Sequence, residues 1–80
     1  MKKSAFTAEY KSLCRLLRAK RQAHGLTQED LAARIGESQS FVSKFERGER
    51  RLDLVQLRFV CRSIGVSILD FVTEYEKSLR

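Results

Sequence analysis

The sequence predicts an all-α fold, a compact set of five helices in a single domain over residues 1–80. Apolar residues recur three or four positions apart along most of the chain, which is the spacing of a helix with one buried face. The chain has no proline, and each of its four glycines follows a stretch with this spacing. Glycine can end a helix because it adopts a left-handed backbone without a steric clash. Four such ends imply five helices, and no segment requires a strand.

The first two helices are predicted over residues 8–24 and 27–34. The apolar face of the first is expected to contain Tyr10, Leu13, Leu16 and Leu17. The second follows a glycine and starts at Thr27, whose hydroxyl can cap the helix. The side chain of Asp30, three residues later, can accept a hydrogen bond from the backbone N–H of the capping residue and so complete a capping box. This start has the pattern of a well-defined helix N-terminus.

The remaining helices are predicted over residues 38–46, 53–64 and 67–78. Ser38 can cap the third helix, but the residue before it is Glu37, which is charged and cannot form an apolar contact across the cap. We therefore expect an exposed joint between the second and third helices. The last two starts repeat the earlier pattern of a capping residue followed three positions later by an acid or amide, with the pairs Asp53 and Gln56, and Ser67 and Asp70.

The charge of the chain is unevenly distributed. The net charge is +6, and residues 1–65 hold fourteen Lys or Arg against seven Asp or Glu. Residues 66–80 hold two against three. A basic body with a nearly neutral end favours a polyanionic partner, although small basic domains without such a partner are common.

Several classes of function have no support in the sequence. Cys14 and Cys61 stand far apart without a CxxC pair, so neither a metal site nor a disulfide is indicated, and both are expected to be buried. His24 stands beside a glycine as a helix-end cation. No nucleophile and base are paired, so we expect no enzyme activity, no cofactor and no small-molecule substrate. No long apolar run or signal peptide is present, so we expect a cytoplasmic protein that does not bind a membrane.

The second and third predicted helices carry the most specific motif. In the twenty residues 28–47, a set of small and apolar residues stands at the fifth, ninth, fifteenth and eighteenth places, namely Ala32, Gly36, Val42 and Phe45. With Leu26-Thr27-Gln28-Glu29-Asp30-Leu31-Ala32 and Phe45-Glu46-Arg47-Gly48, this segment resembles the helix-turn-helix of the phage repressor and Cro type, the Xre family. The similarity extends over about residues 12–72. It implies a repressor-like DNA-binding domain that usually works as a dimer on operator DNA, with its third helix in the major groove.

The third helix is expected to read base pairs. At about 100° per residue, its polar residues share the side opposite to Val42 and Phe45. The residues predicted to read bases are Gln39, Ser40, Ser43 and Lys44. Glutamine can pair with adenine, lysine suits the acceptors of guanine, and serine can serve either sort of base. The alternative is an ordinary solvated face, which any surface helix has.

Four residues are predicted to contact the phosphate backbone: Gln28, Arg47, Arg50 and Arg51. The resemblance implies that Gln28 binds a phosphate and braces a glutamine in the third helix, here Gln39. The N–H groups at the start of a helix also favour an anion there. Gln28 could instead be an ordinary helix-start residue, and Arg50 and Arg51 could be charges in an exposed turn that contact nothing.

Two further features concern architecture. The resemblance implies that Arg21 and Glu46 form an ion pair that ties the first helix to the third, the alternative being that both charges are solvated. An apolar stripe on the last helix, 67–78, is predicted to hold two copies of the chain together as a homodimer on a roughly palindromic operator. The alternative is that the stripe is simply an exposed helix end. The stripe consists of Ile68, Phe71, Val72, Tyr75 and Leu79. The core would need the first three, which leaves Tyr75 and Leu79 for a second copy.

The sequence is compatible with two classes of function. The first is a sequence-specific transcriptional regulator that binds double-stranded DNA. The second is a protein-interaction module, such as an antitoxin-like partner, whose helix-turn-helix is a scaffold and whose last helix binds another protein. A stoichiometric partner that co-purifies would favour the second. Binding to an anionic membrane is disfavoured, because the basic region lacks a strongly apolar exposed stripe.

Overall fold

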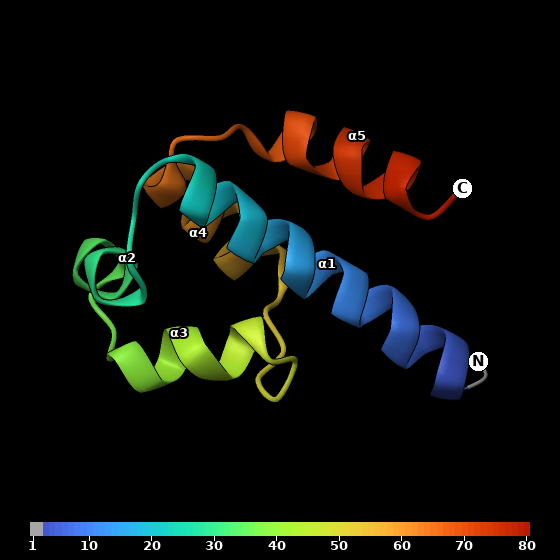
Figure 1. Cartoon of the computed structure of the whole chain (residues 1–80), viewed down its shortest axis with the longest axis horizontal. Coiled ribbons are helices and arrows are strands. Elements are labelled where there is room, and N and C mark those ends of the chain that lie inside the picture. The colour runs from blue at the N-terminus through green and yellow to red at the C-terminus, as the bar shows by residue number, and fades with distance from the viewer. Residues whose placement is uncertain (1–2) are drawn as a thin grey trace.

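The described part of the protein consists of five helices, as the sequence predicts (Figure 1). This computed structural model describes residues 3–80, with side chains from residue 7 onwards. The helices are α1 (Lys3–Ala23), α2 (Gln28–Ile35), α3 (Gln39–Glu46), α4 (Leu54–Ile64) and α5 (Ile68–Ser78). The bounds of the last four lie within one residue of the prediction. The first helix begins earlier than residue 8, because backbone hydrogen bonding continues beyond the apolar face that revealed it.

The helix starts have the caps that the sequence predicts. The hydroxyl of Thr27 accepts from the N–H of Asp30 at 3.0 Å, and the carboxylate of Asp30 accepts from the N–H of Thr27 at 2.9 Å. These bonds hold the pKa of Asp30 below its ordinary value. Ser38 caps α3 through the N–H of Phe41 alone, at 3.1 Å. Gly36, between α2 and α3, has a φ of 70°, which only glycine adopts readily. The exposed joint therefore turns sharply at this residue.

The helices surround a core to which all five contribute. In Figure 1, α1 crosses the middle of the molecule, with α5 along one side and α2 and α3 on the other. α1 contacts α3, α4 and α5, while α2 contacts α3 and α4. The largest fully buried side chains are Phe45, Phe71, Leu17, Leu31, Ile64, Val42 and Cys61. Because α2 and α3 have only eight residues each, this shared core, and not their own backbone bonds, keeps them helical.

The position of α5 corrects part of the predicted dimer stripe. Phe71 is 1% exposed and belongs to the core of its own chain. Tyr75, predicted to be left over, is half-buried, and its hydroxyl donates to the carbonyl of Glu9 on α1 at 3.1 Å. Val72, predicted to be in the core, is 42% exposed. The reason is rotational: α1 covers the side of α5 that presents Phe71 and Tyr75, and Val72 lies at the edge of that side.

Candidate nucleic-acid interface

The inner face of α3 is anchored in the core. Val42 is fully buried and Phe45 is 1% exposed, and Ala32 of α2 is also buried. Phe41 is half-buried, and its ring meets that of Phe45 edge to face, with centroids 5.7 Å apart. These contacts fix the rotation of α3 about its axis, so its outer face has a defined direction.

The outer face of α3 presents the predicted base-reading side chains. Gln39, Ser40 and Lys44 are exposed, and Ser43 is half-buried. The hydroxyl of Ser43 accepts a hydrogen bond of 2.8 Å from Nη1 of Arg47, one turn later. Three of the four predicted residues are therefore free to meet a ligand, and the fourth orients a neighbouring cation.

Arg47 lies where α3 ends and is held by two side chains. Its Nε forms an ion pair with Glu49, in addition to the bond from Nη1 to Ser43. The side chains of Arg47 and Glu49 are each 57% exposed. An ion pair this exposed contributes little to stability and exchanges readily for another anion. Arg47 can therefore turn from Glu49 to a phosphate at small energetic cost.

A buried polar network fastens α3 to α1 and α2. Nε and Nη2 of Arg21 donate to the two carboxylate oxygens of Glu46, at 2.7 and 3.0 Å. Nη1 of Arg21 donates to the carbonyl of Leu26 at 2.7 Å. The amide of Gln28 donates to Glu46 at 3.0 Å rather than to Gln39, the partner that the resemblance implies. A charged carboxylate is a stronger acceptor than a neutral amide, and by this bond Gln28 braces the end of α3.

The segment after α3 carries the two remaining predicted phosphate ligands. The guanidinium carbon of Arg50 lies 5.2 Å from the ring centroid of Phe41, and that of Arg51 lies 4.9 Å from the ring centroid of Tyr10. Both distances are within the range of a cation–π contact. The two cations are therefore held over aromatic rings just after the end of α3, and do not extend freely into solvent.

Tyr10 is a part of this arrangement that sequence reasoning missed. The sequence placed it on the apolar face of the first helix, yet its hydroxyl donates to the carbonyl of Arg50 at 3.0 Å and accepts from the N–H of Leu52 at 3.2 Å. These partners are 40 and 42 positions away in the sequence. No local pattern around Tyr10 could have indicated them, because they depend on how the helices pack.

Within residues 3–80, no three His, Cys, Asp or Glu residues come together as a metal site, and none of the helices combines the length and the apolar character of a membrane span. Cys14 and Cys61 are buried free thiols, whose pKa values burial raises, to about 11 for Cys61. Burial therefore disfavours the reactive thiolate form of both residues.

The chain is similar to known regulators over most of its length. The family model that matches it is described as helix-turn-helix and covers residues 17–71. The uncharacterized HTH-type transcriptional regulator y4dJ of Sinorhizobium fredii (strain NBRC 101917 / NGR234) is 38% identical over 58 residues, which is 72% of this chain and 75% of y4dJ.

Solved structures agree with this match. An XRE-family like protein from Pseudomonas syringae pv. tomato str. DC3000 superposes with a TM-score of 0.89 at 42% identity, covering 98% of this chain and 95% of that one. The restriction-modification controller protein C.Esp1396I, solved as a tetramer in complex with its natural 35 base-pair operator, gives a TM-score of 0.79 at 26% identity, with 86% of this chain and 91% of that one covered. The family match and the shared fold identify this chain as a member of the XRE family of helix-turn-helix, DNA-binding transcriptional regulators, and not as an enzyme.

Proposed function

We propose that this regulator reads a specific operator in double-stranded DNA by placing α3 in the major groove. The observation that carries the proposal is the division of α3 into two faces. Val42 and Phe45 are buried on one side, and Gln39 and Lys44 are exposed on the other. A helix fixed in this way can hold its polar groups at constant positions relative to base edges. We expect the protein to act in the cytoplasm, together with the DNA that it reads.

The residues divide into two roles. Gln39 suits adenine, Lys44 suits guanine or a phosphate, and Ser40 suits either kind of base. Ser43 is bonded to Arg47, so it reads a base only if that bond is exchanged. The residues that we assign to phosphates are Gln28, Arg47, Arg50 and Arg51. Such contacts position the protein, while base contacts specify the sequence.

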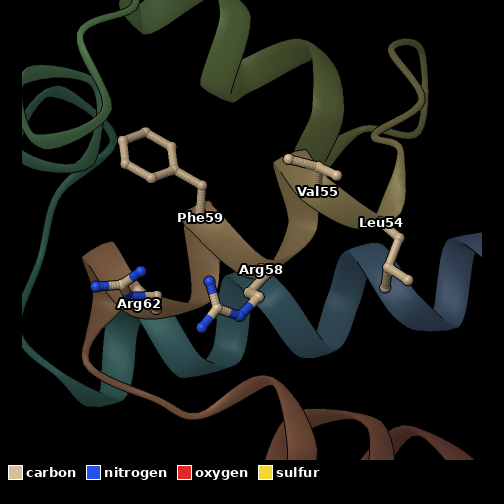
Figure 2. Close-up of a pocket in the computed structure, with 5 residues that line it drawn as sticks. All are labelled: Leu54, Val55, Arg58, Phe59 and Arg62. Carbon is tan, nitrogen blue, oxygen red and sulfur yellow. The ribbon is translucent and has the colours of Figure 1, made fainter.

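We further propose that two copies bind a roughly palindromic operator. The exposed large apolar side chains of the described residues all lie on α4, on α5 or directly after α5, and we call them the apolar surface: Leu54, Val55, Phe59, Leu69, Val72 and Leu79. Only Val72 and Leu79 of the predicted stripe remain in this set. Figure 2 shows the part on α4, where Leu54, Val55 and Phe59 line a groove together with two arginines.

Charge favours a second copy as the partner of this surface. The groove on α4 includes the exposed Arg58 and Arg62, whereas α5 presents the exposed Asp70 and Glu76. A two-fold arrangement that packs α4 of one copy against α5 of the other would bring opposite charges together around the apolar contacts. C.Esp1396I is a tetramer in complex with its operator, which supports binding of more than one copy of this chain to DNA.

Selection of bound sequences from a random duplex pool tests the function. We expect a palindromic consensus, with the selected duplex bound at least about 10³-fold more tightly than random DNA. Both affinities should fall linearly with the logarithm of salt concentration, because phosphate contacts release counterions. An affinity for the best selected duplex that equals the affinity for random DNA at every salt concentration would refute the proposal. A protein partner that co-purifies in fixed ratio would then support the alternative, an interaction module whose last helix, α5, binds another protein.

A further inference from the structure

The connection between α3 and α4, residues 47–53, carries both Arg50 and Arg51. Its first half is tied to α3, because the N–H groups of Glu49 and Arg50 both donate to the carbonyl of Lys44, at 2.9 and 3.3 Å. Its second half is bonded instead to α1, through the side chain of Tyr10, about forty positions earlier in the chain.

The hydroxyl of Tyr10 joins the two sides of this second half. It donates its proton to the carbonyl of Arg50 and accepts from the N–H of Leu52, at 3.0 and 3.2 Å. One hydroxyl thus fixes the peptide units on both sides of Arg51. Partial burial raises the pKa of Tyr10 above its ordinary value, so the hydroxyl keeps the proton that it donates.

The ring of Tyr10 also contacts the connection. The guanidinium of Arg51 lies over it, with 4.9 Å between Cζ and the ring centroid. The connection also passes close to the ring at Gly48, where an added Cβ would lie 3.9 Å from Cδ2 of Tyr10. Guanidinium groups commonly stack on aromatic rings in this way. The stacked position sets the direction in which the side chain of Arg51 leaves the connection.

We propose that Tyr10 is a positioning residue of the DNA-binding surface, which orders residues 47–53 and presents Arg51 to a backbone phosphate. The inference rests on the proposed function, since it assigns Arg51 to DNA. It goes further because it makes a residue of α1, outside the helix-turn-helix, responsible for the strength of the contact between Arg51 and the phosphate. The hydroxyl fixes the conformation of the backbone at Arg51, and the ring fixes the position of the Arg51 guanidinium.

Two variants distinguish the contribution of the Tyr10 hydroxyl from that of its ring. Tyr10→Phe removes the hydroxyl and keeps the ring, while Tyr10→Leu removes both. Tyr75→Phe is the matched control, because its hydroxyl also bonds a backbone carbonyl, that of Glu9, away from the connection. Amide hydrogen exchange at Leu52 in the free protein should become faster in Tyr10→Phe and stay unchanged in Tyr75→Phe.

DNA binding provides the second measurement. Tyr10→Phe should weaken binding to selected and random duplexes alike, by between about threefold and tenfold, the effect of losing a typical hydrogen bond. Tyr10→Leu should weaken it more and lower the salt slope by about one, as expected when one phosphate contact is lost. In an Arg51→Ala background, Tyr10→Leu should have a much smaller effect than in the wild type, because its target is already absent.

The outcomes separate the two proposals. A wild type that fails to prefer any duplex refutes the proposed function, and in that case Leu52 exchange still decides whether Tyr10 orders the connection. If the wild type binds its operator and Tyr10→Phe binds equally well, or if Tyr10→Leu is as harmful with Arg51→Ala as without it, Tyr10 is not a positioning residue. Should Tyr10→Leu fail to fold, Tyr10→Phe and the hydrogen exchange remain sufficient for the test.

Discussion

Arg21 on α1 and Glu46 at the end of α3 form a two-pronged ion pair in which the side chains are only 7% and 3% exposed. Every polar group of the pair has a partner, because Arg21 also bonds the carbonyl of Leu26 and Glu46 also accepts from Gln28. Removing two such charges from water has a large desolvation penalty, so their value lies in fixing an orientation. The pair sets where the end of α3 lies relative to α1.

We expect Arg21→Met to lower the free energy of unfolding by about 3–5 kcal/mol, because Glu46 would remain as a buried carboxylate without its cation. A double change, Arg21→Met with Glu46→Leu, should recover part of this loss. Lys20→Met is the control, since the side chains of its ion pair with Glu74 are 23% and 48% exposed, well above those of Arg21 and Glu46, and the pair should contribute less than about 1 kcal/mol. Urea titrations of the wild type, these three variants and the single variant Glu46→Leu measure the differences, and strictly additive effects at Arg21 and Glu46 would show that the pair is not coupled.

We expect Gln39→Ala and Arg51→Ala to change DNA binding in different ways. Gln39→Ala should reduce discrimination at particular base pairs by about 1–3 kcal/mol, the contribution of one good bidentate contact. Arg51→Ala should weaken all duplexes to a similar degree and lower the salt slope by about one. Binding of each variant to the operator and to single-base substitutions of it provides the measurement. An unchanged base preference in Gln39→Ala would mean that Gln39 does not read a base.

Local signals in the sequence sufficed for the helices but not for all of the site. The cap at Thr27 and the turn at Gly36 involve residues within a few positions of one another, so the sequence predicts them directly. The pairing of Arg21 with Glu46 spans 25 positions and was implied only by the resemblance to a family. The bonds of Tyr10 span 40 positions and had no signal at all.

The error at α5 has a similar origin. Periodicity correctly put Phe71 and Tyr75 on one face of the helix. Around the helix axis, however, Val72 is only about 60° from Tyr75 and about 100° from Phe71. Which edge of that face is covered depends on where α1 lies, and this is a property of the whole fold. Likewise, Gln28 finds the carboxylate of Glu46 only once α2 and α3 are packed together.

We expect the stability of the protein to fall in alkaline solution because of Cys61. Burial raises the pKa of this thiol from 9.0 to about 11, so the folded state holds its proton more tightly than the unfolded state. The sign follows from linkage: the stabilisation is complete below about pH 9 and is lost as pH rises towards 11. A pKa difference of about 2 corresponds to about 3 kcal/mol.

Urea titrations at several pH values compare the wild type with Cys61→Ala. The variant should be less stable at neutral pH, because it leaves a small cavity, but its stability should decline less between pH 9 and 11. The other groups with raised pKa values, Cys14, Tyr10 and Tyr75, are present in both proteins and affect both curves equally. Parallel curves over this range would contradict the role of Cys61.

Finally, we expect the protein to be a dimer in solution, held by the apolar surface of α4 and α5. Val55 and Leu69 are 79% and 74% exposed, so replacing either with glutamate should leave the fold intact. At an interface, however, a buried and unpaired carboxylate is strongly unfavourable, so Val55→Glu and Leu69→Glu should each produce a monomer. Lys44→Glu, on the outer face of α3, should remain a dimer while losing affinity for DNA. Sedimentation measures the mass of each protein. A wild type that stays monomeric at high concentration, or a Val55→Glu/Leu69→Glu double variant that still dimerises, would exclude this surface as the interface.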